Sequence, residues 1–285
     1  MGGASRRRSH AARPQALSVP PTKKRFGQHF LFDPRILARI ADAVGAGPAD
    51  TVLEIGPGPG GLTAALAERA GRLLAIEKDR DLVPALRAKV PRAEIVEGDA
   101  LELDWHALAG PGALICGNIP YNITSPLIDK ALRPPRSPRV VFLVQREVAD
   151  RVAAPPGSAA YGALSVGVQA VAKAERLFTV ARGAFHPPPK VESAVLRLTP
   201  LAEPLVADHR VSIFRRVVVG LFGFRRKQLL RALRELTDWP PEQVQALLAD
   251  LGLDPTARPE TLTPAQFSHL TDSVVDAGWS MEADL

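Results

Sequence analysis

Cysteine is almost absent from this 285-residue sequence, in which Cys116 is the only one. A single thiol excludes an internal disulfide framework and any zinc or iron–sulfur site built on several cysteines. No other cluster of metal-ligating side chains is visible, so we expect no metal. Because disulfides persist mainly in oxidising compartments, the composition favours a reducing, cytoplasmic location.

Long hydrophobic runs are missing as well. The longest candidates, around Val140–Val144 and Val217–Phe224, fall well short of the roughly 18 residues that a membrane-spanning helix needs. Hydrophobic residues still make up 46% of the chain and charged residues 23%, the balance of an ordinary globular protein. The length suits one large domain or two ordinary ones with a full-sized core.

Acidic residues are missing from two segments of a chain whose formal net charge is +6. Residues 1–25 hold seven basic residues and no acid, and residues 210–234 hold eight basic residues and no acid. Most are arginines, which grip phosphate with two parallel hydrogen bonds and stack on bases, so a nucleic-acid partner is one interpretation. A solvated charged surface with a GC-rich coding bias is the other, and charge alone does not separate them.

The sequence predicts three parts. Residues 1–25 lack apolar periodicity and are predicted to be a disordered basic arm. Their composition also fits an organellar transit peptide, whereas the lack of a continuous apolar segment disfavours a secretory signal. Residues 26–200 are predicted to form an α/β domain, and apolar residues at helical spacing predict a small all-helical domain at 201–285.

Strand and helix patterns alternate with short connections over the first part of the α/β domain, which predicts a parallel, doubly wound, Rossmann-like sheet. Two further helices, the second near 162–172, and a strand pair ending at 193–198 complete the domain. A helix is expected to begin at Asp33–Pro34, an N-cap and first-turn proline pair. The other predicted strands are 51–55, 72–77, 94–97, 113–116 and 139–145, and the helices between them are 61–70, 80–89 and 124–132.

A glycine-rich turn, E-I-G-P-G-P-G-G, follows the first predicted strand. Gly56 and Gly58 open a pattern whose small residues let the backbone approach a bound nucleotide. Glu77 ends the next strand, where an acid accepts hydrogen bonds from ribose hydroxyls, and Asp99 follows the third strand at the same edge. The glycines alone fit a dinucleotide or S-adenosylmethionine, but an acid at Asp99 suits the exocyclic amine of adenine.

The segment N-I-P-Y-N, residues 118–122, follows the fourth predicted strand. The Asn118 amide oxygen and a neighbouring main-chain carbonyl can both accept hydrogen bonds from one amino group. Pro120 fixes the backbone so that these acceptors converge, and Tyr121 offers a flat face on which an extruded base can stack. The segment therefore predicts recognition of an amine on a nucleic-acid base.

Six spaced motifs follow one another along the chain: K-R-F-G-Q-H-F-L at 24–31, E-I-G-P-G at 54–58, N-I-P-Y-N-I at 118–123, A-Y-G-A-L-S-V at 160–166, F-H-P-P-P-K-V-E-S-A-V at 185–195 and R-R-K at 225–227. Together they resemble the ribosomal RNA adenine N6-dimethyltransferase family, small-subunit (16S) branch, over about residues 23–270. The resemblance implies a class I methyltransferase domain at 26–200 and a helical RNA-binding domain at 201–285.

The resemblance also implies roles for single residues on the cofactor side. Gln28, His29 and Leu31 would cover S-adenosylmethionine, with His29 at a position where the family has Asn or His. Gly56 would lie against the methionine part, beside Gly58. Glu77 would bind the ribose, Asp99 the adenine, and Asn118 both the cofactor and the target amine.

On the target side, the resemblance implies that Tyr121 stacks on the adenine and Phe185 flanks its other face. Arg225, Arg226 and Lys227 would contact RNA, although Arg231 stands about where the family commonly has an Asn. The implied activity is N6-dimethylation of two adjacent adenosines in the 3′-terminal hairpin loop of small-subunit rRNA, linked to subunit maturation. The implied partner is the rRNA or a pre-30S particle, and we expect the enzyme to act as a monomer.

Three alternatives fit parts of this pattern. A macrolide-resistance-type large-subunit (23S) rRNA methyltransferase shares N-I-P-Y-N-I, but the run at 185–195 and the R-R-K helix favour the small-subunit branch. A non-catalytic nucleic-acid-binding factor on the same fold would not need an intact glycine turn with Glu77, Asp99 and Asn118. An NAD-dependent oxidoreductase would leave the N-I-P-Y segment unexplained.

Overall fold

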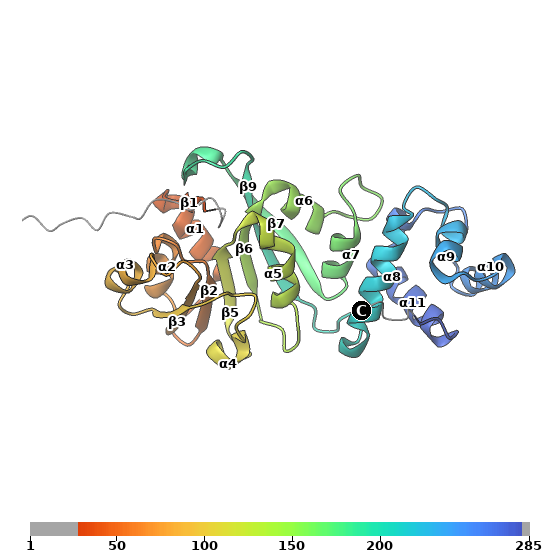
Figure 1. Ribbon diagram of the computed structural model, residues 1–285, viewed down its shortest axis with the longest axis horizontal. Coiled ribbons are helices and arrows are strands. Elements are labelled where there is room, and N and C mark those ends of the chain that lie inside the picture. Colours follow the sequence, from red (N-terminus) through yellow and green to blue (C-terminus); the bar gives the residue numbers. More distant parts are fainter. Residues whose placement is uncertain (1–27, 281–285) are drawn as a thin grey trace, which may run out of the picture.

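The computed structural model describes residues 28–280, so the predicted basic arm lies outside the described residues. A seven-stranded sheet with the order β4-β3-β2-β5-β6-β9-β7 forms its centre (Figure 1). β2 to β6 are parallel, as predicted, whereas β9 pairs antiparallel with both β6 and β7, so the sheet is mixed. The strands are β2 (Thr51–Ile55), β3 (Arg72–Glu77), β4 (Glu94–Glu97), β5 (Leu114–Asn118), β6 (Val140–Gln145), β7 (Ala172–Val180) and β9 (Ser193–Pro200).

The strand order reverses between β2 and β5, which lie side by side. Open α/β sheets bind ligands at such a switch point, outside the carboxyl ends of the strands. The glycine turn follows β2 and the N-I-P-Y segment follows β5, so the topology brings these two motifs together at that edge.

Helices cover both faces of the sheet, since neighbouring residues of one strand enter different cores. Val52 belongs to one buried cluster with Ile40 and Leu66, whereas Leu53 belongs to another with Leu127. This is the doubly wound arrangement that the sequence predicts. The helices of this part are α1 (Pro34–Val44), α2 (Gly61–Ala67), α3 (Val83–Lys89), α4 (Trp105–Ala109), α5 (Thr124–Ala131), α6 (Arg146–Val152) and α7 (Ala163–Gln169).

Every regular element that the structure describes after Pro200 is helical, in agreement with the expected change of character. These helices form one end of the molecule, opposite α1 to α3 (Figure 1). Their core is continuous with that of the sheet, because Phe214 and Leu270 belong to the same buried cluster as Phe142. The helices are α8 (Val211–Gly223), α9 (Leu229–Thr237), α10 (Pro241–Asp250) and α11 (Pro264–Asp276). Across residues 28–280, no helix is long and apolar enough to cross a membrane.

The sequence prediction missed α4 and one short strand pairing, placed the start of α3 at residue 80 rather than Val83, and misplaced two helix ends. β1 (Phe30–Leu31) pairs antiparallel with β8 (Phe185–His186), which ties the first family-like motif to one more than 150 residues later. The helix predicted near 162–172 ends at Gln169, and β7 begins at Ala172. The helix predicted at 61–70 ends at Ala67.

Candidate active site

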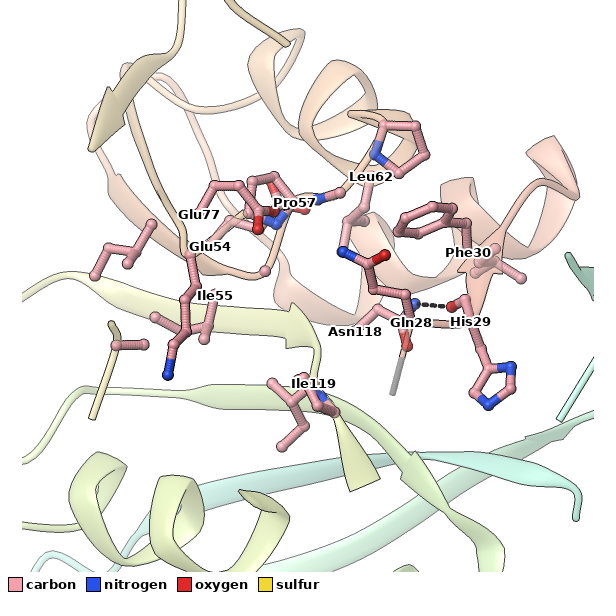
Figure 2. A pocket seen from close by; sticks show the side chains of 18 of the residues that line it. Gln28, His29, Phe30, Glu54, Ile55, Pro57, Leu62, Glu77, Asn118 and Ile119 are labelled. Carbon is pink, nitrogen blue, oxygen red and sulfur yellow. Dashed lines mark hydrogen bonds between the residues drawn. The ribbon is translucent and has the colours of Figure 1, made fainter. Parts of the chain in front are cut away.

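One pocket lies at the carboxyl edge of β2, β3 and β5 (Figure 2). Glu54 and Glu77 lie together at one side of it, and Asn118 and His29 lie at the other. All eight residues predicted to bind the cofactor line this pocket, as do Pro120 and Tyr121: the eight are Gln28, His29, Leu31, Gly56, Gly58, Glu77, Asp99 and Asn118.

The glycine turn needs glycine for its backbone and for space. Gly56 has φ 69° and Gly58 has φ 56°, both in the left-handed region that side chains disfavour. A Cβ atom at Gly58 would lie 3.0 Å from the ring of Phe30, and one at Gly56 would lie 3.6 Å from the Asn118 carbonyl oxygen. Because these two glycines carry no side chains, the turn leaves space in the pocket between Glu77 and Asn118.

Glu77 is held by the turn that it faces. Gly58 N–H donates to its Oε2 at 3.0 Å and Asp79 N–H donates to its Oε1 at 2.7 Å. Burial raises the pKa of this carboxyl, while those two N–H groups oppose the shift. Each oxygen keeps a second lone pair, so both remain able to accept hydrogen bonds from a ligand hydroxyl.

Asp99 is a charged acceptor at the neighbouring strand end. Lys78 Nζ lies 2.5 Å from its Oδ2, and Leu101 N–H donates to its Oδ1 at 2.9 Å. The Lys78 ammonium holds the pKa of Asp99 below its ordinary value. Lys130 steadies the loop after Asp99, because its ammonium donates to the Leu101 and Leu103 carbonyls, each at 2.7 Å.

Glu54 is a feature of the pocket to which the sequence analysis gave no role. Its side chain is only 1% exposed, and its Oε2 has no hydrogen-bond partner among the described residues. Burial raises the pKa of this carboxyl to about 8, with the nearby Glu77 adding to the shift. The signal was an acid among the apolar residues of a strand predicted to be buried, T-V-L-E-I.

Asn118 is oriented by the segment that closes the pocket. Its Nδ2 donates to the main-chain carbonyl of His29 at 2.9 Å (Figure 2). This bond leaves Oδ1 as an acceptor for another donor in the pocket. The His29 ring is fixed in turn, because its Nδ1 donates to the Pro187 carbonyl at 2.8 Å.

Tyr121 lies beside Asn118, in a 3₁₀ turn formed by Tyr121–Ile123. The imidazole of His29 stacks against its ring, with centroids 5.8 Å apart and planes at 27°. Its hydroxyl lies 2.7 Å from Ser193 Oγ. Burial raises the pKa of this phenol, so Tyr121 enters the pocket as a neutral aromatic ring.

Phe185 is not among the residues that line the pocket. Its side chain is 5% exposed and packs in the core beneath β1, where the residue pairs with Leu31. The structure therefore does not place Phe185 in the wall of this pocket, and its predicted contact with the target base stays a prediction.

Several cations of the basic block at 210–234 are already paired with acids within the protein, so fewer are available for RNA than the sequence suggests. Acids elsewhere in the chain pair with four of its members: Arg210 with Asp272 and Asp276, Arg215 with Asp129, and Lys227 and Arg231 with Glu235. Arg225 and Arg226 are exposed at the end of α8 and form no ion pair with residues 28–280. Of the R-R-K motif, the two arginines are therefore the available cations.

The pocket fits S-adenosylmethionine by the chemistry of its donor set. Glu77 supplies acceptors for ribose hydroxyls, and Asp99 supplies a charged acceptor for an adenine amine. The unpartnered Glu54 oxygen suits the cationic end of such a ligand, since a buried acceptor without a partner is costly. The bare Gly56–Gly58 turn leaves room for the ligand to lie between these groups.

Together, the fold and the pocket define a class I S-adenosylmethionine-dependent methyltransferase. A family model described as ribosomal RNA adenine dimethylase matches residues 21–276. The chain belongs to this family.

Three similar proteins support that assignment. Ribosomal RNA small subunit methyltransferase A of Acidithiobacillus ferrooxidans is 44% identical over 265 residues, which cover 91% of this chain and 97% of that protein. The crystal structure of a dimethyladenosine transferase from Plasmodium falciparum is similar with a TM-score of 0.78 and 25% identity, covering 88% of this chain and 99% of that one. That of the 23S rRNA methyltransferase ErmE has a TM-score of 0.68 and 32% identity, with coverages of 85% and 98%.

Proposed function

We propose that this protein transfers methyl groups to N6 of two adjacent adenosines in the 3′-terminal hairpin loop of small-subunit rRNA. The observation that carries the proposal is the convergence of Asn118 and Tyr121 with Glu77 and Asp99 in one pocket. An amine acceptor and an aromatic face thereby border a site suited to an adenosyl cofactor.

The chemistry follows from the arrangement around Asn118. The N6 lone pair of adenine is delocalised into its ring, which makes the amine a poor nucleophile. Asn118 Oδ1 and a neighbouring main-chain carbonyl accept hydrogen bonds from the two N–H groups of the amine and favour a pyramidal nitrogen with a localised lone pair. Bound S-adenosylmethionine supplies an electrophilic methyl group. S-adenosylhomocysteine would be the other product, and the methylated amine would release one proton to solvent. Positioning and electrostatics are sufficient for this transfer, which needs no covalent intermediate on the protein.

Tyr121 provides an aromatic ring on which the target adenine can stack after it leaves the RNA. Stacking on an aromatic ring offsets part of the cost of extruding a base. A hairpin-loop adenine is already poorly stacked, so extrusion costs little and two neighbouring adenines can enter in turn. Arg225 and Arg226 are suited to hold phosphates without reading sequence. The arm at 1–25 is proposed to add to this phosphate binding.

The small-subunit target is favoured by the balance of similarity. The small-subunit methyltransferase of A. ferrooxidans is 44% identical, compared with 32% for the large-subunit enzyme ErmE. We further propose that the protein acts as a monomer, in the cytoplasm, on a pre-30S particle. The domain limits at 1–25, 26–200 and 201–285 remain part of this proposal.

A side-by-side labelling assay tests the proposed substrate. Small-subunit particles purified without this modification and large-subunit rRNA are each incubated with the enzyme and methyl-labelled S-adenosylmethionine. We expect label only in the small-subunit RNA, at two adjacent adenosines carrying two methyl groups each. Label only in large-subunit RNA would establish the large-subunit alternative. Label in neither, with cofactor binding intact, would favour a non-catalytic factor.

A further inference from the structure

The hydrogen bond between Tyr121 and Ser193 joins the pocket to a strand that does not line it. The phenol oxygen and Ser193 Oγ are 2.7 Å apart, across 72 residues of sequence. Ser193 is fully buried at the start of β9, while the Tyr121 ring borders the pocket. The bond therefore anchors the polar end of a side chain whose flat part faces the site.

Ser193 is a firm anchor because its backbone is paired on both sides. It lies opposite Gln145 on β6 and opposite Val180 on β7. Within the described part of the chain, Tyr121 is the one hydrogen-bond partner of Ser193 Oγ. Within the described residues, the serine hydroxyl therefore hydrogen-bonds only to the phenol of Tyr121.

Tyr121 stands in a short 3₁₀ turn, so its backbone alone holds the ring less firmly than a long helix or a central strand would. The hydroxyl bond to Ser193 and the stacked ring of His29 fix two parts of the same side chain. Without the Ser193 hydroxyl, the ring would keep its neighbour but lose the contact that sets its tilt.

We propose that Ser193 is a positioning residue for methyl transfer, whose hydroxyl holds the Tyr121 ring at the angle at which the target adenine stacks. The proposal rests on the proposed function, in which Tyr121 receives that base. Because Ser193 does not line the cofactor pocket, its loss should slow turnover and leave cofactor affinity unchanged.

The test removes the bond from either end. Ser193→Ala and Tyr121→Phe each delete one hydroxyl, and the double variant deletes both. The matched control is Ser137→Ala, which removes an equally buried serine hydroxyl that bonds the Ala113 and Arg139 carbonyls away from the pocket. Turnover on small-subunit particles at saturating cofactor, S-adenosylhomocysteine affinity by calorimetry and thermal unfolding are measured for each variant.

We expect Ser193→Ala and Tyr121→Phe each to lower kcat about three- to tenfold, the effect of one hydrogen bond. The double variant should be no slower than the slower single variant, since both remove the same contact. Affinity for S-adenosylhomocysteine should stay within about twofold of the wild type. Ser137→Ala should keep wild-type kcat even where it lowers the unfolding temperature as much as Ser193→Ala does.

Three results would overturn the inference: wild-type kcat in Ser193→Ala, fully multiplicative losses in the double variant, or weakened cofactor binding in Ser193→Ala. A Tyr121→Ala variant separates this failure from that of the proposed function. If Tyr121→Ala is nearly inactive while Ser193→Ala is normal, only the positioning role is wrong. If Tyr121→Ala is fully active, the stacking role of Tyr121 is wrong and the role of Ser193 falls with it.

Discussion

The two sides of the pocket are assembled in different ways. On the cofactor side, Gly56, Glu77 and Asp99 follow three successive parallel strands, and each is held mainly by groups near it in the chain or on the neighbouring strand. On the target side, Asn118 ends β5 and Tyr121 comes three residues later, and both side chains depend on distant segments.

This difference separates what each side contributes. Apart from the segment at residues 28–31, the cofactor side consists of main-chain turns and carboxylates that the topology of the sheet brings together. The target side consists of side chains whose orientation depends on tertiary contacts, such as the Asn118 bond to the His29 carbonyl. Substitutions on the first side should change cofactor affinity, and substitutions on the second should change the rate of transfer.

The largest effect should come from Asn118→Ala. Loss of the acceptor for the target amine should lower kcat about 10²- to 10³-fold, the range seen when one positioned polar group is removed from an active site. Single-turnover transfer with saturating cofactor measures this directly. A loss below about tenfold would show that Asn118 does not act on the reacting nitrogen.

Tyr121→Ala should have the next largest effect. Removing a stacking face worth about 1–3 kcal/mol per base should reduce transfer roughly 5- to 150-fold. Tyr121→Phe keeps the face and serves as the matched control, with the smaller loss expected for the hydroxyl alone. Equal losses in the two variants would contradict a role in stacking.

On the cofactor side, Gly56→Val and Glu77→Ala should each weaken S-adenosylmethionine binding by at least about 1–2 kcal/mol, or roughly 5- to 30-fold. Valine at φ 69° is strained, and loss of Glu77 removes the ribose acceptor together with the support of the glycine turn. Calorimetric titration measures the change, and thermal unfolding reports whether the fold survives. Unchanged affinity in both variants would exclude this pocket as the cofactor site.

Glu54→Gln should change how the stability of the protein depends on pH. The pKa of Glu54 is raised from 4.5 to about 8, so the folded protein without cofactor loses stability as pH rises from about 4.5 to about 8. Burial of Glu77 acts in the same direction. Between pH 5 and pH 8, the wild type should therefore lose at least about 1 kcal/mol more of its unfolding free energy than Glu54→Gln loses. Denaturant unfolding of the two proteins at both pH values measures this difference. Parallel pH profiles in the two proteins would contradict this.

The smallest effect concerns RNA binding at the end of α8. Arg225→Glu and Arg226→Glu should each flatten the dependence of log affinity on log salt by about 0.7, the value for one phosphate contact. Lys227→Glu should change the slope less, because Glu235 already pairs with Lys227. Filter binding at several salt concentrations measures the slopes. A larger change for Lys227→Glu would mean that this ion pair opens on RNA.

The sequence was sufficient for the parallel strands and for placing Gly56, Glu77 and Asp99 at one edge of the sheet, because hydrophobic runs and strand-end spacing are local signals. It could not reveal β1 and β8, whose two residues each are too short to show periodicity. It could not show that the Phe185 side chain is buried in the core, and the contact of Phe185 with the target base, implied by the resemblance, stays a prediction. It also could not show that Asp272 and Asp276 pair with Arg210, since only folding brings them together.

The division of the pocket is tested most directly by calorimetric titration of S-adenosylhomocysteine into Tyr121→Ala and Glu77→Ala side by side. The account predicts affinity within about twofold of the wild type for Tyr121→Ala and weakened at least about fivefold for Glu77→Ala. If Tyr121→Ala loses as much affinity as Glu77→Ala, the two sides do not have separate tasks and the account is contradicted.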